Sequence, residues 1–105
     1  MGHSLIVENI NISEIKAYES NPKIHKSKQI QQIVNSISEF KFNNPILIDE
    51  NNIVIAGHGR LLAAKHLNMD KVPAIKLLHL SDAQKKAYRI ADNKLTENGE
   101  WRMGF

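Results

Sequence analysis

One stretch of the chain, Ile53–Ala64, limits the possible folds more than any other. It begins with four apolar residues, which predict a buried strand, and continues as a run of good helix formers. Gly57 and Gly59 lie between these two elements, and neither has a Cβ that would keep a ligand away from the backbone. A strand that enters a helix through a glycine turn brings backbone N–H groups and the positive end of the helix dipole together. The stretch therefore predicts an anion site, above all for phosphate.

Two side chains determine the chemistry of this turn. Arg60 falls in the first turn of the predicted helix, where a cation is unfavourable against the dipole, so we expect it to serve a ligand. Its forked guanidinium suits a phosphate. His58 can donate to a phosphate, act as an acid or base near neutral pH, or simply fill the turn. The pattern is not a Walker A loop, and a plain connecting turn remains the alternative interpretation.

Length and composition narrow the class of protein. A chain of 105 residues predicts one domain over 1–105, with its core in about 5–95 and a tail over 96–105. Cysteine is absent, which excludes disulfides, thiolate nucleophiles and thiolate zinc sites. The net charge of +3 permits a nucleotide or nucleic-acid partner without requiring one. Since the sequence lacks a signal peptide and a long apolar run, we expect a cytoplasmic protein without a membrane partner.

Apolar spacing predicts the elements that precede the glycine turn. Residues 5–12 begin apolar and then alternate, as in a strand with one wet side. Isoleucine and valine then recur at helical spacing, which predicts a helix over 28–40 with Ser27 as its N-cap. Two short apolar runs, 46–48 and 53–56, flank four polar residues, and this arrangement predicts a β-hairpin.

The elements after the turn complete the pattern. We expect a helix from Arg60 that ends before Asn68, a residue suited to the left-handed conformation. A strand follows over 72–78, and Pro73 near its start indicates an edge or strand-entry position. A capping box then opens a helix over 82–95. The order β, α, β-β, α, β, α predicts an α+β fold, a small mixed sheet with a hairpin packed by three helices.

Three polar groups outside the turn are candidates for ligand binding. Asp92 and Asn93 lie side by side near the end of the last helix, where a carboxylate and an amide can hold a magnesium ion bound to phosphate. The basic loop over 21–26 either folds over a ligand or is simply solvated. Lys85, Lys86 and Arg89 cluster on the last helix and predict a surface that follows DNA phosphates, with a solvated helix face as the alternative.

Taken together, these stretches resemble the N-terminal domain of the ParB family, within the ParB/sulfiredoxin-like superfamily. The matching pieces are Asn21-Pro22-Lys23 and residues 34–40, 44–48, 53–64 and 72–75. The resemblance covers about 5–95, and its order and spacing are more specific than any single motif. The sequences AGHGR at 56–60 and IADN at 90–93 look especially like ParB-like nuclease domains associated with DNA methyltransferases of phage and mobile elements.

The resemblance implies a site for CTP with magnesium. By position, the nucleotide site of the family falls on Gly57, Gly59, Arg60, Asp92, Asn93, Asn21 and Lys23. Gly57, Gly59 and Arg60 match the turn that cradles the phosphates. Asp92 and Asn93 match the pair that helps hold the metal. Asn21 and Lys23 match the early loop near the nucleotide. His58-Gly59 replaces a Glu-Arg pair of the partition proteins, so a carboxylate is missing and CTP hydrolysis is in doubt. The chain also stops before a helix-turn-helix domain, so sequence-specific DNA reading by it alone is not expected.

We therefore expect a nucleotide-binding ParB-like domain that serves plasmid or phage partition, transcription regulation or DNA modification. One alternative is a small-molecule kinase or phosphotransferase that uses ATP, with His58 as the candidate base. Another is a DNA-binding accessory or nuclease domain, although the sequence has no acidic metal cluster to support a nuclease. The expected ligand is CTP or ATP with magnesium, and DNA is reached through a fused or associated domain. Turnover as an NTPase and formation of a homodimer stay open.

Overall fold

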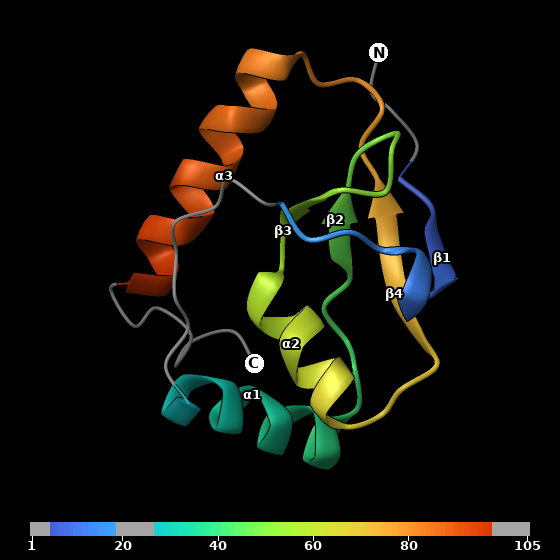
Figure 1. Ribbon diagram of the computed structural model, residues 1–105, viewed down its shortest axis with the longest axis vertical. Coiled ribbons are helices and arrows are strands. Elements are labelled where there is room, and N and C mark those ends of the chain that lie inside the picture. Colours follow the sequence, from blue (N-terminus) through green and yellow to red (C-terminus); the bar gives the residue numbers. More distant parts are fainter. Residues whose placement is uncertain (1–4, 19–26, 98–105) are drawn as a thin grey trace.

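The computed structural model describes residues 5–18 and 27–97 (Figure 1). In chain order its elements are β1 (Val7–Asn11), the 3-10 helix η1 (Ile12–Glu14), α1 (Ser27–Phe40), β2 (Ile46–Ile48), β3 (Val54–Ala56), α2 (His58–His66), β4 (Lys71–Lys76) and α3 (Asp82–Glu97). The predicted order is confirmed, with one short 3-10 helix added. Ser27 is the first residue of α1 instead of its N-cap, a difference of one residue that helix assignments commonly show.

The four strands form one mixed sheet in the order β1-β4-β2-β3. β1 and β4 are antiparallel, β4 and β2 are parallel, and β2 and β3 form the predicted antiparallel hairpin. The chain reaches β4 from this hairpin through α2. In Figure 1, α1 and α2 lie together at one end of the sheet, and α3 runs along the side of the hairpin. The α+β fold with a mixed sheet and three helices is thus confirmed.

The edge position that Pro73 suggested is wrong, because β4 lies between β1 and β2. Pro73 is aligned with Asn9 of β1, whereas the pairing with β2 begins only at Ala74. Proline has no N–H to donate, so it is tolerated where a strand has not yet gained its second neighbour. Pro73 therefore fits the alternative of strand entry within an inner strand.

The core explains why the predicted elements assemble in this way. One buried cluster joins the sheet to α2 and includes Ile46, Ile48, Val54, Leu61 and Val72. A second cluster lies where α1 packs on α2 and contains Ile33, Val34 and Ala63. The apolar stripe of α1 thus faces α2, as its helical spacing predicts.

The end of α2 follows its predicted geometry. Asn68 has φ +58°, and the N–H of Met69 donates to the carbonyl of Ala64 at 3.1 Å. Met69 also packs against the main core cluster. Within the part of the chain that the structure describes, no helix combines the length and the apolar character that crossing a membrane requires.

Candidate functional site

The junction between β3 and α2 has the conformation for which its first glycine is suited. Gly57 is the N-cap of α2 and has φ +102°, a value that residues with a Cβ rarely adopt. The N–H of Leu61 donates to the Gly57 carbonyl at 2.9 Å and closes the first helical turn. α2 therefore begins at His58, two residues before the expected start, and its positive dipole end lies directly at the junction.

The guanidinium of Arg60 is folded back over this junction. Its Nη2 donates to the carbonyl of Pro45 at 3.2 Å, just before β2 begins. Burial lowers the pKa of Arg60, whereas Asp92 and Tyr88 act in the opposite direction. Because the ordinary pKa of arginine is so high, the side chain stays protonated at neutral pH. A permanent cation thus lies at the N-terminal end of α2.

A cavity of about 720 Å³ lies beside Arg60. Its lining residues are Asn44, Pro45, Leu47, Ala56, Arg60, Leu80, Gln84, Ala87, Tyr88, Ala91 and Asp92. They come from the segment just before β2, the middle of β2, the end of β3, the first turn of α2, the segment just before α3 and one face of α3. A volume of this size is typical of small-molecule sites. Arg60 and Asp92, which are far apart in the sequence and which the family resemblance assigns to one site, line the same cavity.

The other predicted site residues either do not line the cavity or are not fully described by the structure. His58 is buried at the start of α2 and is not among the residues that line the cavity. Gly59 is buried in the same turn. Asn21 and Lys23 lie outside the described residues, and the structure describes the helical backbone of Asn93 but not its side chain. Their roles in ligand binding therefore stay predictions.

The metal prediction rests on Asp92. Among the described residues, no three His, Cys, Asp or Glu side chains are grouped so that they could hold a metal ion by themselves. Mg²⁺, however, is commonly bound through one or two carboxylates together with the phosphates of a substrate. A single carboxylate that shares a cavity with Arg60 fits this second kind of site, in which the ligand itself supplies further oxygens.

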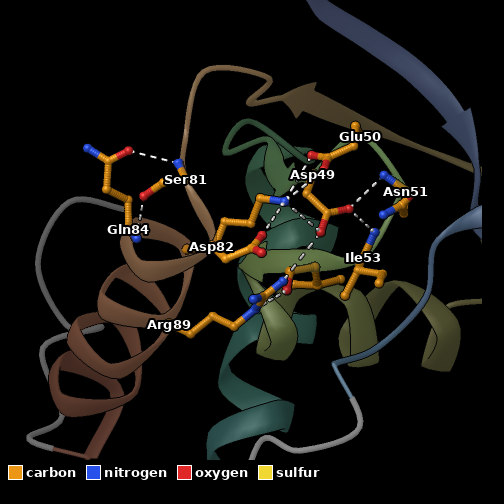
Figure 2. A network of polar contacts seen from close by, with 10 residues as sticks. Asp49, Glu50, Asn51, Ile53, Ser81, Asp82, Gln84 and Arg89 are labelled. Atoms are coloured by element: carbon orange, nitrogen blue, oxygen red, sulfur yellow. Dashed lines mark hydrogen bonds and ion pairs between the residues drawn. The ribbon is translucent and has the colours of Figure 1, made fainter.

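The expectation that Lys85, Lys86 and Arg89 share one exposed basic surface is wrong. Lys85 and Arg89 are 6% and 8% exposed. Lys85 binds Glu50 in the loop of the hairpin, and Figure 2 shows Arg89 directed toward the hairpin from α3. Only Lys86 is exposed to solvent. Helical spacing correctly places residues 85 and 89 on one face, but that face packs against the body of the domain.

The acidic loop of the hairpin explains why two cations are buried here. Lys85 Nζ donates to both carboxylate oxygens of Glu50, at 2.9 and 3.0 Å, and lies 3.7 Å from Asp49 Oδ2. These contacts raise the pKa of Lys85 and lower the pKa of Glu50. Asp82, at the start of α3, lies 3.7 Å from the same ammonium. Lys85 thus joins the first turns of α3 to the loop between β2 and β3.

Arg89 makes a second connection one turn further along α3. Its Nε donates to the carbonyl of Val54 in β3 at 2.9 Å, and its Nη2 lies 3.8 Å from Asp49 Oδ2. The guanidinium carbon lies 3.9 Å from the centre of the Tyr18 ring, a cation–π distance. We refer to Asp49, Glu50, Lys85 and Arg89 as the α3 clamp.

Asp49 is the structural residue that the sequence analysis missed. Its Oδ1 accepts the N–H groups of Asn51 and Ile53, at 2.8 and 3.0 Å, so it shapes the hairpin loop as well as facing both cations (Figure 2). An aspartate at the first position of a polar turn is the sequence signal for this role. The capping box of α3, in contrast, is confirmed, because Ser81 and Gln84 exchange side-chain to backbone hydrogen bonds.

Comparison with known proteins places this geometry in a family. The sequence model of the ParB N-terminal domain matches residues 1–94. The chain is 47% identical over 75 residues to the ParB-like nuclease domain-containing protein YnaK of Escherichia coli (strain K12), which is 71% of this chain and 86% of that relative. It is 36% identical over 73 residues to a probable chromosome-partitioning protein ParB of Rickettsia typhi, covering 69% of this chain. These residues make up only 26% of the partitioning protein.

The fold agrees with a solved structure of the same kind. The C-terminally truncated chromosome-partitioning protein ParB of Caulobacter crescentus, complexed with CTP-γ-S, superposes with a TM-score of 0.73. The match covers 83% of this chain and 52% of that one, at 21% sequence identity. At this identity the likeness concerns the fold, and it confirms the architecture that the sequence resemblance implies.

Proposed function

Since the chain belongs to the ParB N-terminal domain family, we propose that the cavity beside Arg60 binds a nucleotide, with CTP as the first candidate. The ligand found with the Caulobacter relative, CTP-γ-S, is the reason to begin with cytidine. The proposal concerns binding. Hydrolysis or phosphoryl transfer is not part of it, because His58, the candidate base, does not line the cavity.

One observation supports the proposal most directly, namely the position of Arg60. A permanent cation, half-buried at the positive end of α2, lines a cavity large enough for a nucleotide. Charge-assisted hydrogen bonds from a guanidinium to phosphate oxygens are strong and often bidentate. We propose that Gly57 and Gly59 contribute through the backbone of the turn at the start of α2, although neither is among the residues that line the cavity.

The remaining predicted residues would complete the site around the phosphates. Asp92 and Asn93 would hold a magnesium ion that the nucleotide phosphates also bind. Asn21 and Lys23 are proposed to contact the nucleotide, as the family resemblance implies for these two positions. In this arrangement Arg60 would neutralise part of the charge of the phosphates, and Asp92 would hold a metal ion that supplies further positive charge.

We further propose that nucleotide binding serves a DNA-related process, such as plasmid or phage partition, transcription regulation or DNA modification. The partitioning relative from Rickettsia supports a process of this kind. The chain spans about a quarter of that relative, so DNA contact is proposed through a fused or associated domain, and a homodimer is proposed on the same family basis.

The test is calorimetric titration of the chain with CTP, ATP and GTP, each with and without Mg²⁺. We expect Arg60→Ala to weaken binding of the preferred nucleotide by about ten-fold or more, since a hydrogen bond to a charged group contributes about 1.5–3 kcal/mol. Lys86→Ala is the matched control, because it removes one exposed positive charge of α3 that does not line the cavity. Full nucleotide affinity in a folded Arg60→Ala protein would refute the proposal.

A further inference from the structure

Most of the cavity is not suited to phosphate. Apart from its charged and amide residues and Tyr88, it is lined by Pro45, Leu47, Ala56, Leu80, Ala87 and Ala91. These side chains offer no hydrogen bonds and do not attract an anion. A ligand that fills the cavity must therefore present an apolar surface in addition to its phosphates.

Tyr88 is the aromatic residue of this lining. On α3 it lies one turn after Gln84 and one turn before Asp92, and all three line the cavity. Tyr88 is 41% exposed as a residue, so part of it remains uncovered by the protein. The two nearby cations of the same helix, Lys85 and Arg89, belong to the α3 clamp on another face.

The lining residues of α3 extend far enough along the helix for a ligand with a charged part and an uncharged part. Gln84 and Asp92 are eight residues apart on α3, which corresponds to about 12 Å along the helix axis. Asp92 and Arg60 are the charged residues of this lining, and Asp92 lies at the C-terminal end of the lining face of α3. The other end, near Leu80 and Gln84, carries no charged side chain among the lining residues.

We propose that Tyr88 stacks on the base of the bound nucleotide while Arg60 holds its phosphates. This inference rests on the proposed function and makes it narrower, because it assigns the ligand to nucleotides instead of inorganic polyphosphates or small phosphorylated sugars. Aromatic rings stack on any base, so Tyr88 contributes to affinity for the nucleotide class, and selection among bases falls to other groups.

The experiment compares CTP with inorganic triphosphate, both with Mg²⁺, by calorimetry on the whole chain. The wild type should bind CTP more tightly than triphosphate, and Tyr88→Ala should reduce that preference by about ten-fold, in keeping with measured stacking contributions. Triphosphate affinity should stay unchanged in this variant. Tyr88→Phe should keep the preference, because it retains the ring.

A second substitution separates stacking from folding. Tyr88→Leu keeps an apolar side chain on α3 but has no aromatic face, and it should lose the preference as Tyr88→Ala does. The inference is overturned if Tyr88→Leu binds CTP like the wild type, or if both ligands weaken equally. If the proposed function itself is wrong, the result differs from these outcomes, because Arg60→Ala would then leave the binding of both CTP and triphosphate unchanged.

Discussion

The Arg60 guanidinium packs directly against Gly57, on the side from which a side chain would project. An added Cβ at Gly57 would lie 3.0 Å from Arg60 Nη2 and 3.4 Å from the Cα of Ile46. The glycine is thus required twice, once for its positive φ and once for the space that the cation fills. The absence of a Cβ at residue 57 thus permits both the backbone conformation of the junction and the position of the Arg60 guanidinium beside it.

Gly57→Ala is expected to affect both stability and binding. The left-handed backbone should cost about 1–3 kcal/mol in the free energy of unfolding, measured by urea denaturation. The new methyl group should also displace the guanidinium, so nucleotide affinity should fall even at temperatures where the variant is fully folded. An unchanged urea midpoint together with unchanged affinity would contradict the geometry of the junction.

The Lys85–Glu50 contact predicts a pH-dependent part of the stability. The folded pKa of Glu50 lies below its ordinary value of 4.5, so its contribution is present above that value and is lost as pH falls through the folded pKa. The folded pKa of Lys85 lies above its ordinary value of 10.5, so its contribution is lost as pH rises through that folded pKa. The pair therefore stabilises the fold between these limits.

Glu50→Gln should accordingly lower the Tm at neutral pH and leave it nearly unchanged at strongly acidic pH, where Glu50 is protonated in both states. Thermal unfolding followed by circular dichroism over a pH series measures this difference. Glu39→Gln is the matched control, because it removes a carboxylate that is exposed on α1, away from Lys85. An equal loss of Tm at all pH values would argue against the ion pair as the cause.

Arg89 and Lys86 should differ sharply although both are cations of α3. Arg89→Ala removes a hydrogen bond to the buried Val54 carbonyl, and we expect a loss of about 1.5–3 kcal/mol in the free energy of unfolding. Lys86→Ala should change it by less than about 0.5 kcal/mol, since Lys86 is exposed. If Arg89→Ala and Lys86→Ala lower the free energy of unfolding equally in urea denaturation, Arg89 does not hold α3 on the domain.

Removal of magnesium should weaken nucleotide binding through Asp92. We expect EDTA to lower the affinity of the wild type for CTP, and Asp92→Asn to lower it in the presence of Mg²⁺ while making the affinity insensitive to EDTA. Asp70→Asn is a suitable control, because Asp70 is exposed and does not line the cavity. If Asp92→Asn responds to EDTA like the wild type, the metal is held elsewhere.

Periodicity and turn chemistry were sufficient to predict the order of the elements. The strand, glycine turn and helix from Ile53 to Ala64 are a local pattern, and the structure shows them with Arg60 at the cavity. Asp92 could also be predicted to join Arg60, although this step depended on the resemblance to a family. These predictions were possible because each depends on residues that are close together in the sequence or on an order of motifs that recurs in the family.

The exposed basic surface and the edge alternative for Pro73 failed for a different reason. Spacing places Lys85 and Arg89 on one face of α3, but it does not say whether that face meets solvent or the acidic loop at Asp49. Similarly, Pro73 has no backbone N–H, which predicts that one hydrogen bond to a neighbouring strand is absent at this position. It does not reveal that β4 pairs with both β1 and β2, which are distant from it in the sequence. Both outcomes depend on tertiary contacts that no local pattern specifies.

β3 is anchored to both helices that line the cavity. Arg89 of α3 binds the carbonyl of Val54, and the same strand continues through Ala56 and Gly57 into α2. Thermal motion that tilts the hairpin should therefore move Arg60 and Asp92 in the same direction. Their separation would then fluctuate less than the position of either one, so a ligand held between them meets a site of nearly constant width.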